Sequence, residues 1–154
     1  MMPNMEREGL LEYAVGGEVL LAAQPQPEDF MGLLGRGVRT VINLRGDAER
    51  AALERQNAEA AGLCYIHLPL PMHELEPQHL AEAARAIAEV EGGLCIHCRG
   101  ARRASLLWAL YRVVHLGWSP AEALAELAAA GYNGEAIDAC AYCIDDYLER
   151  TAAV

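Results

Sequence analysis

A cysteine and three arginines follow one short apolar segment in the second half of the chain. The segment 94–97 leads directly into Cys98, which is followed by Arg99, Gly100, Ala101, Arg102 and Arg103. A loop between a strand and a helix N-terminus binds anions, because free backbone N–H groups and the helix dipole converge there. Such a loop stabilises a cysteine thiolate, and an arginine presents a planar fork to a tetrahedral oxyanion. A thiolate, an amide cradle and a guanidinium are the groups needed to attack a phosphoryl group.

Each residue of this loop has a predicted role. Cys98 is the candidate nucleophile, and Arg103 is close enough in sequence to turn back and hold the anion. The side chains of Arg99 and Arg102 either extend the pocket to a second anionic group or remain solvated charges. The residues predicted to bind substrate are Arg99, Gly100, Ala101 and Arg102.

Strands and helices alternate along the chain and would position this loop. Segments 19–23, 38–44, 64–68 and 94–97 are short, apolar and partly β-branched, which is typical of buried strands. Helices are predicted at 28–35, 47–61, 78–91, from the loop to about 116, 120–130 and 134–150. This alternation predicts an α/β fold, with a small, mostly parallel sheet flanked by helices.

The carboxyl ends of parallel strands form one rim, where ligands bind. Three loops therefore meet there: 44–48, 69–77 and 98–103. A phosphate ester also needs a general acid to protonate its leaving group. The acidic side chains on this rim include Glu74, the first choice, and Asp47, the second; each is alternatively a solvated loop charge.

Length, charge and cysteine content indicate the number of domains and the classes of partner. The 154 residues fit one domain, 1–154, and 53% are hydrophobic. A net charge of −10 disfavours binding to nucleic acid or to an anionic membrane surface. No apolar run approaches the roughly 20 residues that span a bilayer. An odd number of cysteines, five, fits reduced thiols in the cytoplasm. The composition does not define an oligomeric state.

Two CxxC spacings raise the possibility of zinc. Cys95 and Cys98 form one pair, and Cys140 and Cys143 form the other. Zinc requires all four thiolates to converge in a tetrahedron. Cys95 lies inside an apolar strand, however, and the second pair shares the apolar face of a helix. Core packing explains both pairs better, so neither a metal nor another cofactor is predicted.

With these elements placed, residues 19–132 resemble bacterial phosphatases related to the dual-specificity phosphatases, often labelled beta-lactamase hydrolase-like. The resemblance rests on Val-Ile-Asn-Leu-Arg at 41–45, on His-Cys-Arg at 97–99 and on Gly-Trp-Ser-Pro at 117–120. It implies a dual-specificity-phosphatase-like fold and a phosphocysteine intermediate on Cys98, with Arg103 binding the phosphoryl oxygens. It also implies that His97 supports the loop and the thiolate through hydrogen bonds. The implied substrate is a phosphorylated small molecule or a phosphoprotein.

The chain departs from this family's loop at two positions. The family pattern places glycine three residues after the cysteine, where this chain has Ala101. Related phosphatases place a hydroxyl residue directly after the arginine, whereas here Ala104 is followed by Ser105 one position late. Two other functions therefore remain open: a rhodanese-like sulfurtransferase, whose loop has the same short spacing, and a catalytically silent anion-binding module.

Overall fold

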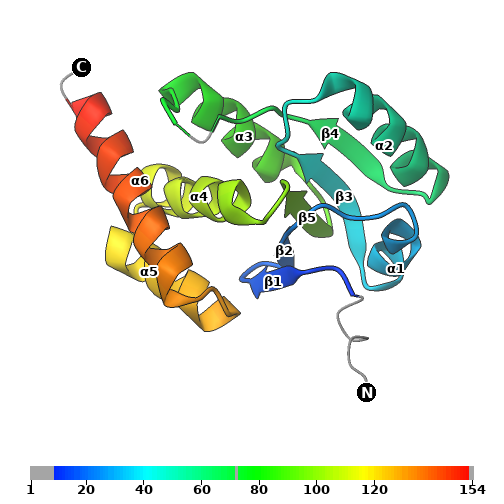
Figure 1. Cartoon of the computed structure of the whole chain (residues 1–154), viewed down its shortest axis with the longest axis horizontal. Coiled ribbons are helices and arrows are strands. Elements are labelled where there is room, and N and C mark those ends of the chain that lie inside the picture. The colour runs from blue at the N-terminus through cyan, green and yellow to red at the C-terminus, as the bar shows by residue number, and fades with distance from the viewer. Residues whose placement is uncertain (1–8, 72, 153–154) are drawn as a thin grey trace.

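The computed structural model describes residues 9–71 and 73–152, which form a five-stranded sheet with helices on both faces (Figure 1). The strand order is β1-β2-β5-β3-β4; β1 is antiparallel to β2, and all other neighbours are parallel. The strands are β1 (Glu12–Val15), β2 (Val19–Ala22), β3 (Val38–Asn43), β4 (Cys64–His67) and β5 (Gly93–His97). The predicted α/β fold with a small, mostly parallel sheet is confirmed.

Every predicted helix is present, with small changes at the ends. The helices are α1 (Asp29–Gly35), α2 (Ala48–Ala60), α3 (Pro77–Glu89), α4 (Arg102–Leu110), α5 (Pro120–Ala130) and α6 (Gly134–Ala152). The helix after the cysteine loop does not stay α-helical to its end, because its last turn is the π-helix η2 (Tyr111–His115). None of the described helices is both long and apolar enough to cross a membrane.

Strand β1 is the element that the sequence did not predict. Its four residues mix polar and apolar side chains, and it lies at the edge of the sheet, where it pairs with β2 alone. The equally short β2 is apolar throughout, whereas β1 begins with a glutamate and lacks a continuous apolar run that would mark a buried strand.

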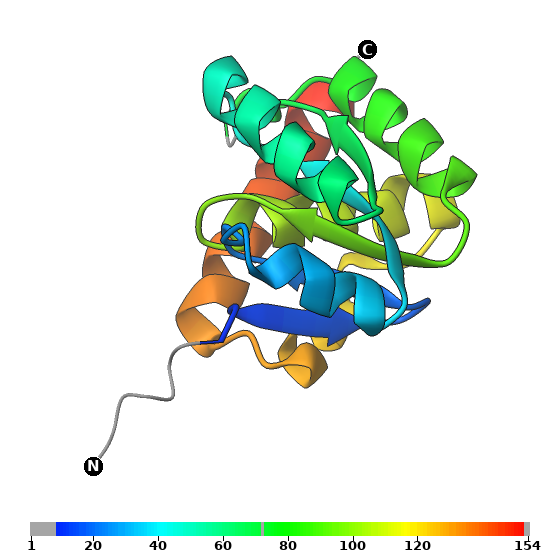
Figure 2. The ribbon, with the colours of Figure 1, turned by 90° about the vertical axis from the view of Figure 1, so that its right-hand side faces the viewer.

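The sheet separates two apolar cores, because successive strand side chains point to opposite faces. Ile42 and Ile96 pack in the larger core, where α4 and α6 supply most of the helical side chains. Val41 and Cys95 pack in the smaller core, beneath α1 and α2. Figure 1 shows α1 and α2 on one side of the sheet and α3 to α6 on the other, and Figure 2 shows α1 in front of the strands.

The register of the parallel strands brings their last residues together. His97 of β5 is level with Ala22 of β2 on one side and with Asn43 of β3 on the other, and Asn43 is level with His67 of β4. The segments that follow these four strands therefore share one edge of the sheet, as predicted.

A polar cluster around Glu126 links the helices of one layer to the turn between β1 and β2. Arg112 lies between the rings of Trp108 and Trp118, with its guanidinium carbon 4.6 and 4.1 Å from the ring centroids. Its Nε and Nη2 donate to Glu126 of α5 at 2.9 and 2.7 Å. The indole of Trp108 and the backbone N–H of Gly16 also donate to Glu126, each at 3.0 Å. One carboxylate thus joins α4, η2, α5 and the β1–β2 turn.

We predict that Glu126→Gln destabilises the fold at neutral pH by about 1.5–3 kcal/mol, the usual contribution of hydrogen bonds to a charged group. Burial raises the pKa of Glu126, but the bonds from Arg112, Gly16 and Trp108 outweigh it and bring the pKa below the ordinary 4.5. A lowered folded-state pKa gives stability that is present above the unfolded value and is lost as the pH falls through the folded one. Urea unfolding at neutral pH and near pH 3 should therefore show the two proteins converging in acid. An equal difference at both pH values would contradict this assignment.

Candidate active site

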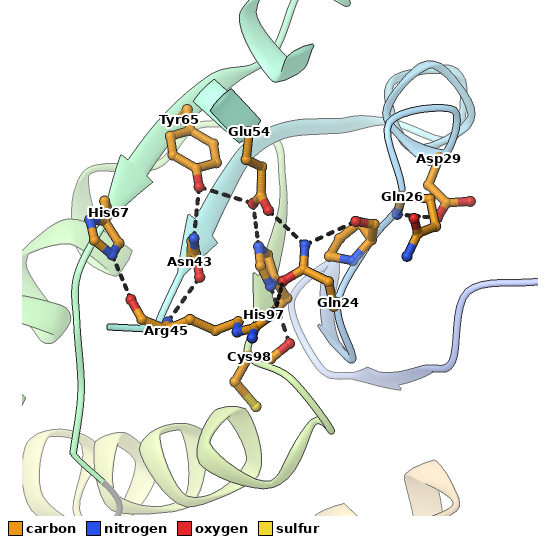
Figure 3. Close-up of polar contacts among 11 residues, drawn as sticks. Gln24, Gln26, Asp29, Asn43, Arg45, Glu54, Tyr65, His67, His97 and Cys98 are labelled. Carbon is orange, nitrogen blue, oxygen red and sulfur yellow. Dashed lines mark hydrogen bonds and ion pairs between the residues drawn. The ribbon is translucent and has the colours of Figure 1, made fainter. Parts of the chain in front are cut away.

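The cysteine loop is held by the chain segment that follows β2. The N–H of Cys98 donates to the Ala22 carbonyl at 3.2 Å, and the N–H of Gln24 donates to the Arg99 carbonyl at 3.1 Å. A β-bridge also joins Ala23 to Gly100. The side chain of Cys98 points to the α4 side of the sheet (Figure 3), and the residue is 1% exposed. The loop backbone is thus fixed while its sulfur faces the N-terminal end of α4.

Ala101 occupies the position where the resemblance implies glycine, and it adopts the conformation that glycine favours. Its φ is 70° and its ψ is 2°, in the left-handed region, and it is the N-cap residue of α4. This conformation costs an L-residue roughly 1–2 kcal/mol. The Ala101 carbonyl accepts hydrogen bonds from the Tyr132 hydroxyl at 2.8 Å and from the Ser105 N–H at 3.2 Å. The loop thus keeps the turn that glycine would allow, at the cost of strain.

Free amide groups line the loop. In the part of the chain that the structure describes, the N–H groups of Arg99, Gly100, Arg102 and Arg103 donate to no protein acceptor. Unpaired donors at the start of a helix, together with its dipole, attract an anion. The loop therefore has the donors that a phosphoryl group requires.

The three arginines of the loop point in different directions. Arg103 is half-buried, and its Nη1 donates to the Leu44 carbonyl at the end of β3 at 3.3 Å, which keeps it on the rim. Arg102 turns to α6, where its Nη2 lies 3.6 Å from a carboxylate oxygen of Glu135. Arg99 is exposed. Arg103 is thus on the predicted edge, whereas Arg102 forms an exposed ion pair.

A buried ion pair lies directly behind Cys98 (Figure 3). His97 is fully buried, with Nε2 2.5 Å from Glu54 Oε2 and Nδ1 3.3 Å from the Cys98 carbonyl. The Glu54 carboxylate also accepts from Gln24 Nε2 at 2.7 Å and from the Tyr65 hydroxyl at 3.0 Å. The imidazole thus lies between the Glu54 carboxylate and the carbonyl of Cys98. A buried, hydrogen-bonded ring therefore supports the peptide of the candidate nucleophile.

The charge of Glu54 follows from the same contacts. Burial alone raises the pKa of this carboxyl. The hydrogen bond and charge of His97, together with the bonds from Gln24 and Tyr65, outweigh it and leave the pKa below its ordinary value. Glu54 is therefore a carboxylate, and it holds the ring of His97 in place.

Glu54 is the functional residue that the sequence analysis missed. It lies on α2 with Ala51 and Ala58, and all three are buried. Their spacing of three and four residues marks the inward face of a helix. A glutamate in that register is a sign of a buried charge, which needs a partner.

A cavity of about 410 Å³ lies between the 24–27 turn, the end of β3 and α2, and its lining residues come from these segments and from α1, not from the cysteine loop. Arg45 lines it, and its Nη1 donates to Gln24 Oε1 at 2.8 Å. Phe30 and Leu53 contribute an apolar part of its wall. Gln24 thus connects the cavity wall to both Glu54 and the cysteine loop.

The two candidate acids lie on different parts of the rim. Asp47 lines the cavity and is the N-cap of α2, where its Oδ1 accepts from the N–H groups of Glu49 and Arg50 at 3.0 and 3.1 Å. Glu74 is exposed in the loop before α3, with φ of 58°. The next residue, Leu75, accepts a hydrogen bond from Arg150 of α6.

Ser105 and the cysteines of the two CxxC spacings pack inside the protein and form no metal site. Ser105 is buried, and its Oγ donates to the Arg102 carbonyl at 2.7 Å. Cys95 packs in the core opposite to that of Cys98 and Cys140. Among the described residues, no group of three or more His, Cys, Asp or Glu side chains is arranged to hold a metal ion.

The fold and loop define a class: a phosphatase-like α/β domain with its cysteine at the end of a central parallel strand. Residues 13–115 match the model of the "Beta-lactamase hydrolase-like protein, phosphatase-like domain" family. Since this match covers more than half of the chain, the protein belongs to that family.

Proteins of similar sequence are found in several bacteria. A beta-lactamase hydrolase-like protein of Xylella fastidiosa is 31% identical over 105 residues, which are 65% of this chain and 24% of that protein. The dual specificity protein phosphatase TpbA of Pseudomonas aeruginosa is 29% identical over 126 residues, which are 80% of this chain and 56% of TpbA. The chain therefore spans about a quarter of the length of the first relative.

Solved structures share the fold. The crystal structure of TpbA from P. aeruginosa superposes with a TM-score of 0.67 at 22% identity, over 91% of this chain and 92% of TpbA. TpbA has also been crystallised in complex with pTyr. The core catalytic domain of the PP-IP phosphatase SIW14 from S. cerevisiae gives 0.61 at 16% identity, over 92% of this chain and 90% of that domain. The predicted dual-specificity-phosphatase-like fold is confirmed.

We predict that Glu54→Gln slows the alkylation of Cys98 by iodoacetamide. The amide cannot replace the carboxylate that accepts from Gln24 and Tyr65 and contacts His97, so the support behind the Cys98 peptide is weakened. Alkylation of Cys98 would be followed by mass spectrometry across the pH range in which the protein stays folded.

Tyr65→Phe is the matched control, because it removes one donor to Glu54 but leaves the carboxylate beside His97. Its reaction profile should stay close to that of the unmodified chain. Identical profiles for Glu54→Gln and the unmodified chain would show that the ion pair does not influence the thiol.

Proposed function

We propose that this chain is a cysteine-dependent phosphatase that hydrolyses a phosphomonoester through a phosphocysteine intermediate. The observation that carries the proposal is the position of Cys98, between the buried His97–Glu54 pair and the free amides at the start of α4. A thiolate in that position has a buried imidazole–carboxylate pair behind it and anion-binding donors around it. Membership of a phosphatase-like family supports the same reading.

The proposed reaction has two steps. The Cys98 thiolate attacks phosphorus in line, and the bond from phosphorus to the leaving oxygen breaks as a general acid protonates that oxygen. Water then attacks the phosphocysteine, which releases inorganic phosphate and restores the thiolate. Arg103 and the loop amides would hold the three phosphoryl oxygens most tightly in the transition state.

The proposed substrate is a phosphorylated small molecule or a phosphoprotein. We place the part of the substrate next to the phosphate in the cavity that Gln24 joins to the cysteine loop, with Arg45 as donor and Phe30 and Leu53 as an apolar surface. The complex of TpbA with pTyr supports a phosphorylated substrate. The net charge of −10 supports the absence of nucleic-acid and membrane partners.

We also propose a cytoplasmic location. Cys64 is exposed and Cys143 is partly exposed, and both are free thiols. Accessible thiols of this kind persist in a reducing compartment.

The first test is hydrolysis of p-nitrophenyl phosphate in the presence of a chelator. We expect metal-independent turnover, which Cys98→Ser lowers by at least about 10³-fold because the serine hydroxyl is a far weaker nucleophile. Cys64→Ser is the control, since it removes an exposed thiol on β4 without touching the loop.

Two other outcomes separate the alternatives left open by the sequence. Sulfur transfer from thiosulfate to cyanide without phosphatase turnover would establish a sulfurtransferase. Oxyanion binding with neither activity, in a protein whose Cys98 is reduced, would establish a silent anion-binding module.

The general acid is tested with leaving groups of different basicity. We propose Glu74 in this role and predict that Glu74→Gln slows hydrolysis of phosphotyrosine by about 10²–10⁴-fold. Hydrolysis of p-nitrophenyl phosphate should change little, because p-nitrophenolate leaves without a proton.

Asp47→Asn is the comparison variant, because asparagine caps a helix about as well as aspartate. If Asp47→Asn produces the leaving-group-dependent loss and Glu74→Gln does not, the acid is Asp47.

A further inference from the structure

Tyr132 is a buried residue that the proposed reaction does not use. It follows α5 and Gly131, and it is 7% exposed. Its ring stacks on Tyr13 of β1, with centroids 3.8 Å apart and planes 19° apart. Its hydroxyl donates to the Ala101 carbonyl at 2.8 Å. A side chain distant in sequence thus contacts the one left-handed residue of the cysteine loop.

This contact fixes the orientation of a peptide plane. The carbonyl of Ala101 and the N–H of Arg102 belong to the same planar trans peptide, so they point in opposite directions. Tyr132 and the Ser105 N–H hold the carbonyl toward the body of the protein. The Arg102 N–H therefore faces away from Tyr132, and it is one of the loop amides that donate to no protein acceptor within residues 9–71 and 73–152.

Alanine at position 101 destabilises this orientation of the 101–102 peptide. Alanine disfavours a positive φ, whereas glycine adopts it freely. A shift of residue 101 out of the left-handed region would release the strain. Such a shift changes φ of Ala101, so it would move the Ala101 carbonyl away from the Tyr132 hydroxyl and redirect the Arg102 N–H.

We infer that Tyr132 is a positioning residue that fixes the 101–102 peptide in its anion-binding orientation and so compensates for alanine at position 101. This inference rests on the proposed role of the loop in binding a phosphoryl group. Tyr132 acts through the peptide of Ala101 and Arg102, and it does not touch the substrate.

Tungstate affinity tests the inference without any need for turnover. Tungstate is a tetrahedral oxyanion, and its dissociation constant for the folded chain would be measured by calorimetry. Tyr132→Phe should weaken binding roughly 3- to 10-fold, as expected for the loss of one hydrogen bond. The same substitution in the Ala101→Gly chain should weaken it by less than about 2-fold, because glycine holds the turn unaided.

The matched control is Tyr13→Phe, which removes the hydroxyl of the stacked ring and leaves the bond from Tyr132 to Ala101. It should bind tungstate as tightly as the unmodified chain. A purely structural role of Tyr132 would change the urea midpoint in both backgrounds but leave the tungstate affinity of the folded protein unchanged.

Three results would overturn the inference: equal affinity with and without the Tyr132 hydroxyl, an equal loss in the alanine and glycine backgrounds, or no tungstate binding by any variant. A chain that binds tungstate in the predicted pattern but hydrolyses no phosphate ester would support the inference and refute the proposed phosphatase function. The two failures are therefore distinguishable.

Discussion

The pairing of Glu54 with His97 is the constraint on which the candidate site depends. The Glu54 carboxylate is not tolerated alone in the interior, because an unpaired buried charge is costly. It needs His97, and it also needs its donors Gln24 and Tyr65. These four residues come from α2, from β5, from the turn after β2 and from β4. Satisfying one buried charge thus brings together the elements that surround the cysteine loop.

This pairing also explains why the cysteine loop has little freedom on its inner side. His97 contacts the carbonyl of Cys98, while the backbone of Ala22 and Gln24 contacts the loop on either side of the cysteine. The outer side is different, because several N–H groups there have no protein acceptor among the described residues. A rigid support with unsatisfied donors is the arrangement expected of a preorganised anion site.

Local signals in the sequence identified the fold and the cysteine loop. The strand before Cys98 and the helix after it are apolar and contiguous, so the loop could be placed from its neighbours alone. The sequence has alanine at position 101, where the family has glycine, and in the structure Ala101 has the left-handed φ that glycine favours. The contacts from Glu54 to His97 and from Tyr132 to Ala101 join residues 43 and 31 positions apart, and no local pattern reports such distances. Strand β1 was not predicted for a different reason, since it lacks the continuous apolar run of the equally short β2.

The stack of Tyr13 on Tyr132 has a consequence for the order in which the protein is assembled. Tyr13 is among the first described residues to leave the ribosome, whereas Tyr132 follows the whole cysteine loop. A nascent chain that has just exposed its loop therefore lacks the side chain that donates to Ala101. Contacts between residues so far apart form late in folding, because closing a long loop costs entropy before the contact forms. The hydrogen bond to the Ala101 carbonyl thus requires that the segment after α5 has been made and has docked against β1.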